Sequence, residues 1–230
     1  MNISMDYVLE KLEILLKTPS PTGNTEKAIN FVENEFRTLG LTTKRTNKNA
    51  LIATIEGKNK EKEITLSGHV DTLGGMVKEI KGNGRLKITQ LGGYVWNTIE
   101  GEHVEIETLE GKKYTGTFMT TKASSHVHGE ETETIKRNME NMEIRIDEIV
   151  NTAEDVKELG INVGDFVFFD PRCIFTNSGF IKSRHLDDKA GVAALLGIGK
   201  YLMENNIKPE YTTNVFISNY EEVGHGAAAS

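Results

Sequence analysis

The periodicity of the chain changes twice, and this double change limits the folds open to it. Up to about residue 72, and again after about residue 178, stretches with helical spacing alternate with short apolar runs. Between residues 73 and 177, short β-like runs separated by turns dominate. Alternating strands and helices favour an α/β sheet, whereas many short strands favour a barrel. The sequence therefore predicts an α/β domain into which a small β-barrel domain is inserted.

The two outer segments are expected to build one domain together. Residues 1–72 supply its first part, residues 178–230 supply a second and incomplete part, and residues 73–177 form the barrel. Apolar residues at helical spacing predict three helices in the outer segments, and apolar or alternating runs predict four strands. The expected helices cover 7–16, 24–39 and 189–203, and the expected strands cover 42–45, 51–55, 63–67 and 214–218.

Composition excludes several kinds of partner. The net charge of −7 argues against nucleic acid and against anionic membranes. No run approaches the roughly 18 apolar residues that a membrane span needs, and the N-terminus lacks the basic start and apolar core of a signal peptide. Cys173 is the only cysteine, which excludes an intrachain disulfide framework and a multi-cysteine zinc site. We expect a cytoplasmic protein without nucleic acid or membrane as partner.

Three short segments carry side chains suited to metal binding and proton transfer. Each lies beside the end of a predicted strand or helix, and they are His69-Val70-Asp71, Asp187-Asp188 and Glu221-Glu222. Sites in open α/β sheets collect at the C-terminal ends of the strands, so these segments are expected to converge. In the first segment, the imidazole could bind a metal while the carboxylate two residues later fixes its tautomer.

Each segment also has an ordinary interpretation. A histidine two residues before an aspartate arises often by chance, and adjacent acids commonly lie in solvated turns or at helix N-termini. The apolar run 215–217 argues against this interpretation for Glu221 and Glu222, because a buried strand would carry them to the interior edge of the sheet. A buried pair of carboxylates needs a metal ion or a shared proton.

Taken in order, three motifs resemble those of a known family. They are SGHVDTLG at 67–74, HLDDKAG at 185–191 and YEEVG at 220–224. Together they resemble the M42 family of dinuclear metallo-aminopeptidases, to which the tetrahedral and glutamyl aminopeptidases belong. The order, the spacing and the intervening barrel all match, so the resemblance covers essentially the whole chain.

This resemblance implies a role for each site residue. His69 would bind one metal ion, Glu222 would bind the other, and Asp187 would bridge both; Asp187 is assigned over Asp188 because the family's second position often carries an amide. Glu221 would be the general base that takes a proton from the water between the metals, and Asp71 would orient His69. The implied cofactors are two divalent metal ions, zinc or cobalt, which acidify water and polarise the scissile carbonyl.

The resemblance also implies a substrate and an assembly. The activity would be removal of N-terminal residues from peptides, and the barrel would mediate a homo-oligomer, a dimer that builds to a dodecamer. The family pattern continues past Ser230 with a further Asp ligand and a C-terminal His ligand. We therefore expect a chain that lacks one protein ligand for each metal, binds zinc or cobalt poorly and has no appreciable peptidase activity alone. The strand 214–218 is expected to keep an unpaired edge.

Two other functions stay open. Some members of the family have carried an endoglucanase label, and two carboxylates could act as acid and base in a glycoside hydrolase. A non-catalytic assembly fragment is the third reading. The remaining histidines receive ordinary interpretations: His103 as a surface or core residue, His126 and His128 in an exposed loop, and His185 and His225 flanking the proposed site.

Overall fold

The computed structural model describes residues 3–227, and the chain divides into two compact units. One unit combines residues 1–72 with 171–230, and the other consists of residues 73–170. Each unit has its own hydrophobic core. The predicted fold class, an α/β sheet with an inserted β-barrel, is confirmed.

The barrel unit ends at Asp170, seven residues before the boundary expected at 177. Residues 171–177 pack with the α/β unit instead. Ile174–Phe175 (β10) pairs with Ile181–Lys182 (β11) in a small hairpin, and Cys173 and Phe175 pack against the core of the α/β unit. The backbone N–H of Arg184 also donates to the carbonyl of Pro171 at 2.8 Å. The sequence pattern changes at the turn of this hairpin, near residue 178, whereas the packing changes before the hairpin begins.

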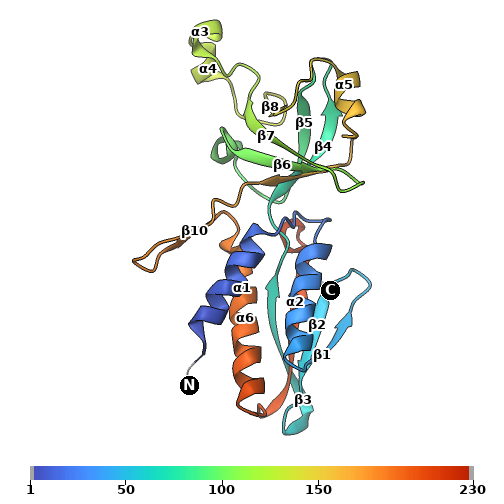
Figure 1. Cartoon of the computed structure of the whole chain (residues 1–230), viewed down its shortest axis with the longest axis vertical. Helices are drawn as coiled ribbons and strands as arrows, with labels where there is room; N and C mark the ends of the chain where they lie inside the picture. The colour runs from blue at the N-terminus through green and yellow to red at the C-terminus, as the bar shows by residue number, and fades with distance from the viewer. Residues whose placement is uncertain (1–2, 228–230) are drawn as a thin grey trace. The chain divides into compact units, whose positions relative to one another are not determined.

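The α/β unit is a four-stranded sheet with three helices on one face (Figure 1). The strand order is β1-β2-β12-β3, in which β12 runs antiparallel to β2 and parallel to β3. The strands are β1 (Thr42–Arg45), β2 (Leu51–Ile55), β3 (Asn59–His69) and β12 (Tyr211–Ser218). The helices are α1 (Met5–Lys17), α2 (Glu26–Thr38) and α6 (Leu186–Glu204).

Amphipathic spacing explains why the helices form where they do. In α1 the Ser4 side chain accepts the N–H of Tyr7, and the residues one turn apart on the buried side are leucines, Leu12, Leu15 and Leu16. The apolar face of α2 ends at Phe36, which is fully buried. In the part of the chain that the structure describes, no helix is both long and apolar enough to cross a membrane.

The expected unpaired edge of the strand 214–218 is wrong. This segment belongs to β12, which pairs on both sides and lies inside the sheet. The open edges are those of β1 and β3. The first half of β3 carries charged, mostly exposed residues, 60–63, and charges of this kind protect an edge strand against pairing with other chains. Because these residues are charged, the apolar pattern of the sequence predicted only residues 63–67 of this strand, whereas β3 begins at Asn59.

The second unit is a closed barrel of antiparallel strands in the order β4-β5-β8-β7-β6-β9. The strands are β4 (Gly74–Ile80), β5 (Leu86–Leu91), β6 (His103–Glu107), β7 (Lys113–Thr120), β8 (Met142–Ile146) and β9 (Phe166–Phe169). Its short helices are η1 (Trp96–Ile99), α3 (Ser125–His128), α4 (Glu131–Thr134) and α5 (Ala153–Glu158). Closure pairs every strand on both sides, so the barrel has no edge strand.

Candidate metal centre

The proposed site lies at the C-terminal ends of the two parallel strands. His69 is the last residue of β3, and it stands opposite Ser218, the last residue of β12. The chain leaves β12 through two residues and enters the short helix η2 (Glu221–Val223), while α6 begins with Leu186 and Asp187. The sheet topology thus brings the three segments to one place, as the strand-end rule predicts.

Three of the predicted residues contact one another directly. The Nε2 atom of His69 lies 3.1 Å from Oδ1 of Asp187 and 3.5 Å from Oε2 of Glu221. The His69 side chain is 8% exposed, whereas those of Asp187 and Glu221 are 92% and 52% exposed. The buried imidazole therefore turns one nitrogen toward two solvent-accessible carboxylates.

Asp71 fixes the other side of the imidazole. The Nδ1 atom of His69 lies 3.0 Å from the backbone carbonyl of Asp71 and 3.4 Å from its carboxylate. Because a carbonyl oxygen only accepts, Nδ1 carries the proton and Nε2 is left as the nitrogen that faces the two acids. Burial by itself lowers the pKa of His69, but the hydrogen bond and charge of Asp71, with help from Glu221, raise that pKa to about 9.

The carboxylate of Asp71 is fully buried and bonded on both oxygens. Oδ1 accepts the backbone N–H of Glu221 at 3.1 Å, and Oδ2 accepts the N–H of Glu222 at 3.1 Å and the hydroxyl of Thr22 at 2.8 Å. Burial alone would raise the pKa of Asp71, yet His69, Thr22 and the N–H of Glu222 lower it. The carboxylate is held in its charged form and joins three separate segments of the chain.

Glu222 and Asp188 lie at the same strand ends. Burial, reinforced by the nearby carboxylates, raises the pKa of Glu222 to about 7, against the opposing effect of His69. Burial likewise raises the pKa of Asp188, whose Oδ1 accepts the N–H of Gly191 at 3.1 Å. So many acidic groups around one imidazole create an excess of negative charge that a cation would neutralise.

The donor set fits a divalent cation. One imidazole with several carboxylates is a ligand set that suits zinc and related ions. Two ligand atoms that each lie about 2.0–2.2 Å from one ion stand about 3–3.5 Å apart, which is the range of the contacts from Nε2 of His69 to Asp187 and Glu221. Within residues 3–227, however, no group of three or more His, Cys, Asp or Glu side chains is already gathered around a common centre.

The other histidines lie in the barrel or beside the site. His103 is exposed in β6, whereas His126 and His128, expected in an exposed loop, belong to the short helix α3, where His126 is exposed and His128 is half-buried. His185 precedes α6 and is 2% exposed, while His225 follows η2 and is exposed.

Sequence reasoning missed Thr22. Its segment, Thr18-Pro19-Ser20-Pro21-Thr22-Gly23, predicts only a break between two helices. In the structure it lies against residues 70–72, which are about fifty positions away along the chain, and the hydroxyl of Thr22 reaches Asp71. No local pattern signals such a contact.

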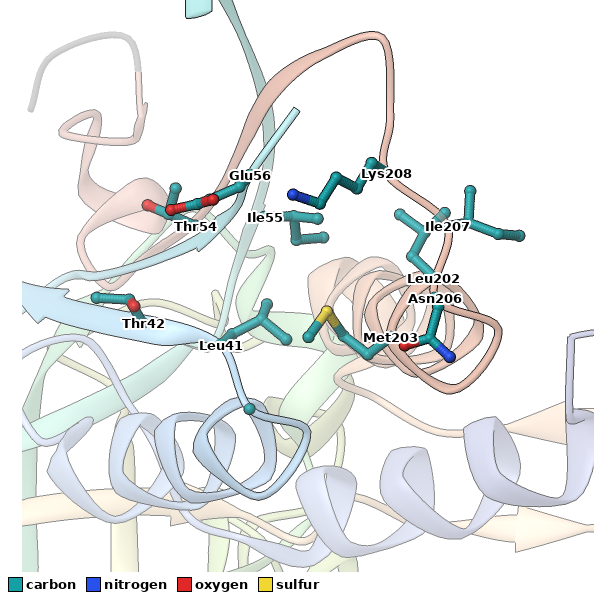
Figure 2. Close-up of a pocket in the computed structure, with 11 residues that line it drawn as sticks. Leu41, Thr42, Thr54, Ile55, Glu56, Leu202, Met203, Asn206, Ile207 and Lys208 are labelled. Atoms are coloured by element: carbon teal, nitrogen blue, oxygen red, sulfur yellow. The ribbon is translucent and has the colours of Figure 1, made fainter. Parts of the chain in front are cut away.

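A separate hollow of about 330 Å³ lies at the other end of α6 (Figure 2). Leu41, Ile55, Leu202 and Met203 form its apolar part, and Glu56 and Lys208 are among its polar lining. It contains no histidine and none of the residues of the candidate metal centre. The chemistry of the strand ends is therefore not located in this hollow.

Comparison with known proteins agrees with the geometry. A sequence profile described as M42 glutamyl aminopeptidase matches residues 49–230, which include all five predicted site residues. The chain belongs to the M42 family. It is also 50% identical over 223 residues to a Bacillus subtilis (strain 168) protein named "Putative aminopeptidase YhfE". That match covers 97% of this chain and 64% of the relative, so the chain spans less than two thirds of the relative's length.

Solved structures of M42 type share the fold. A TET aminopeptidase from a marine sediment archaeon, Thaumarchaeota archaeon SCGC AB-539-E09, superposes with a TM-score of 0.86 at 21% identity, covering 94% of this chain and 60% of that one. The TET1 peptidase of Pyrococcus horikoshii, described as able to assemble into a tetrahedron or a large octahedral shell, gives a TM-score of 0.79 at 23% identity, covering 94% and 62%.

Proposed function

We propose that this chain carries the metal-binding core of an aminopeptidase that removes N-terminal residues from peptides. The observation that carries the proposal is the convergence of a buried, oriented imidazole with Asp187 and Glu221 at the ends of two parallel strands. Membership of the M42 family supports the reaction class. The relatives' names support it further, although the chain covers only part of their length.

Each of the site residues would have its own role in the reaction. His69, Asp187 and Glu222 would hold two divalent ions, zinc or cobalt, with Asp187 shared between them. When bound, such ions polarise the scissile carbonyl and make a water molecule acidic enough to attack it. Glu221, whose side chain is half exposed, would take the proton from the attacking water and pass it to the leaving amine. Asp71 keeps the proton on Nδ1 of His69 and so leaves Nε2 as the ligand atom.

Metal dependence is tested first by removal and return of the ion. The protein that carries this chain should lose hydrolysis of aminoacyl-p-nitroanilides after dialysis against a chelator and regain it with added cobalt or zinc. His69→Ala should remove at least one of the two bound ions per chain, whereas His103→Ala, which removes an exposed histidine of the barrel, should leave metal binding intact. Hydrolysis of these substrates after complete metal removal would contradict the proposal, whereas metal-independent hydrolysis of a glycoside would favour the glycoside hydrolase alternative.

The role of Glu221 needs a separate variant. Glu221→Gln keeps the size of the side chain but removes its charge and with it the base, so kcat should fall about 10²–10⁴-fold with bound metal retained. Glu13→Gln, at a similarly exposed glutamate on α1, is the matched control and should be unaffected. A Glu221→Gln variant with wild-type kcat would exclude Glu221 as the base.

The assembly is a separate proposal. The barrel unit, residues 73–170, would mediate a dimer that builds to a dodecamer, a view supported by the assemblies described for the TET1 relative. Light scattering after size exclusion measures the mass directly. A large assembly without metal binding would instead favour the assembly-fragment reading. Location in the cytoplasm stays a prediction from the sequence.

A further inference from the structure

The segment 18–22 is tied to the proposed site along its whole length. The hydroxyl of Ser20 donates to the carbonyl of Val70 at 2.7 Å, and the N–H of Thr72 donates to the carbonyl of Ser20 at 2.9 Å. Pro21 forms an isolated parallel bridge with Thr72. At the start of the segment, the ammonium of Lys189 donates a hydrogen bond to the carbonyl of Thr18 at 2.7 Å. Lys189 is a fully buried residue of α6. The segment thus runs between α6 and the residues that follow β3.

Thr22 connects this segment to the carboxylate of Asp71 through its hydroxyl. The carboxylate of Asp71 accepts from two backbone N–H groups and from one hydroxyl, that of Thr22. Both Thr22 and Asp71 are buried, with exposed fractions of 5% and 0%. A hydrogen bond to a buried carboxylate is stronger than one between neutral groups. Among the donors to Oδ2 of Asp71 within residues 3–227, only Thr22 supplies a side chain, so a substitution can remove this bond and leave the backbone bonds in place.

The consequence reaches two groups at once. Asp71 contacts His69 through its carbonyl and carboxylate, and it holds the backbone N–H groups of Glu221 and Glu222. A rotation of the Asp71 carboxylate would loosen both the imidazole and the turn that presents the two glutamates. Anything that fixes this rotation therefore fixes the relative position of the imidazole and the glutamates.

We propose that Thr22 is a positioning residue for the metal centre, acting through the carboxylate of Asp71. This inference rests on the proposed function, because the hydroxyl of Thr22 bonds to Asp71 and acts on the proposed ligands through that carboxylate. Partners that orient ligands typically change metal affinity by about 10–100-fold when they are removed. For one hydrogen bond out of three on Asp71, the lower end of that range is expected.

The experiment compares Thr22→Val, Thr22→Ser and Thr72→Val with the wild type. Valine has the shape of threonine without the hydroxyl, and serine retains the hydroxyl. Thr72 is the matched control, since it adjoins Asp71 and is fully buried, but its hydroxyl has no hydrogen-bond partner among the described residues. Two quantities are measured: the affinity for cobalt by competition with a chromogenic chelator, and the amide hydrogen exchange of Glu221 and Glu222 in the metal-free protein.

Thr22→Val should weaken cobalt binding about tenfold and accelerate exchange at Glu221 and Glu222 relative to the rest of the sheet. Thr22→Ser should restore both values to near wild type, and Thr72→Val should change neither. The proposal is overturned if Thr22→Val behaves like Thr72→Val, or if Thr22→Ser is as impaired as Thr22→Val. Loss of stability with unchanged cobalt affinity would also overturn it, because it would leave Thr22 with a structural role only.

Two safeguards keep the test decisive. If Thr22→Val does not fold, Thr22→Cys replaces it, because a thiol of similar size is a weaker donor, and it should rank below Thr22→Ser in both measurements. If the full protein that carries this chain binds no divalent ion, the proposed function fails, yet the exchange rates in the metal-free protein still decide whether Thr22 positions Asp71 and the two glutamates.

Discussion

The two units of this chain use their interiors for different purposes. The α/β unit has an open sheet, and at one end of that sheet it buries His69, Asp71 and Lys189, each within contact of another polar group. The barrel unit is closed, and aromatic rings occupy much of its centre. Trp96 stacks on Phe118 at 5.9 Å, and Phe118 meets Phe169 edge to face at 6.2 Å.

The buried carboxylates of the barrel make contacts that are separate from one another. Asp165 accepts the N–H of Asn162 at 2.7 Å within one turn, and Glu143 pairs with Lys81 at 2.6 Å. Those at the strand ends of the α/β unit instead meet in one group, in which the carboxylate of Asp71 lies near His69 and accepts from Thr22 and from the N–H groups of Glu221 and Glu222. In the closed barrel, packed aromatic rings fill much of the interior. The strand ends of the open sheet instead hold a set of interacting charged groups.

The largest expected effect is a loss of stability confined to the barrel. Phe118→Ala removes a fully buried ring and should lower the free energy of unfolding of that unit by about 3–5 kcal/mol. Trp96, the only tryptophan of the chain, reports the change by fluorescence during urea titration. Cobalt affinity should stay unchanged. Phe180→Ala, which truncates a ring that is 76% exposed, is the control and should have little effect. A weakened cobalt affinity in Phe118→Ala would show that metal binding in the α/β unit depends on the packing of the barrel core.

A smaller effect is expected from Glu33 in the α/β unit. Its carboxylate is buried and accepts from Arg45 at 2.8 Å, Arg37 at 2.6 Å and Thr43 at 2.9 Å. Glu33→Gln leaves the arginines without their counter-charge and should cost about 1–3 kcal/mol at neutral pH. Helical circular dichroism should register the loss, with the Trp96 signal unchanged.

The same carboxylate predicts a dependence on pH. Burial would raise the pKa of Glu33, but Arg45, Thr43 and Arg37 together lower it below the ordinary value of 4.5. Because the folded form has the lower pKa, the stabilisation is complete above about pH 4.5 and disappears as the pH falls through the folded value. Wild type should therefore lose stability on acidification more steeply than Glu33→Gln. Equal acid slopes in the two proteins would show that Glu33 is not the responsible group.

The smallest effect is expected at two hydroxyls, one in each unit. Within residues 3–227, Thr72 of the α/β unit and Thr120 of the barrel are buried and have side-chain oxygens without a hydrogen-bond partner. Replacing either by valine removes an unpaired polar atom at nearly constant shape, so stability should stay the same or rise by up to about 1 kcal/mol. A substantial loss at Thr72 alone would indicate that its hydroxyl serves the metal centre after all.

Much of the fold could be predicted because its signals are local. Helical spacing of leucines predicts α1 within two residues at its start, and the runs 42–45 and 51–55 match β1 and β2. The short strands of the middle region predict a barrel because turns separate them at regular spacing. The order of β1, β2, β12 and β3 was not predictable in this way, because β12 joins the sheet between strands that precede it by about 150 residues.

For the candidate site, the sequence by itself determined which residue types stand at the strand ends, and its motifs indicated His69, Asp71, Asp187, Glu221 and Glu222. Only the tertiary structure decided how they meet. It showed that the carbonyl of Asp71 lies nearer to the imidazole than its carboxylate does, and that the carboxylate holds the turn of Glu221 and Glu222 instead. It also brought Thr22 to Asp71. The reason is physical: a motif records side chains that are neighbours along the chain, whereas a buried carboxylate takes its donors from whichever segments the packing places around it.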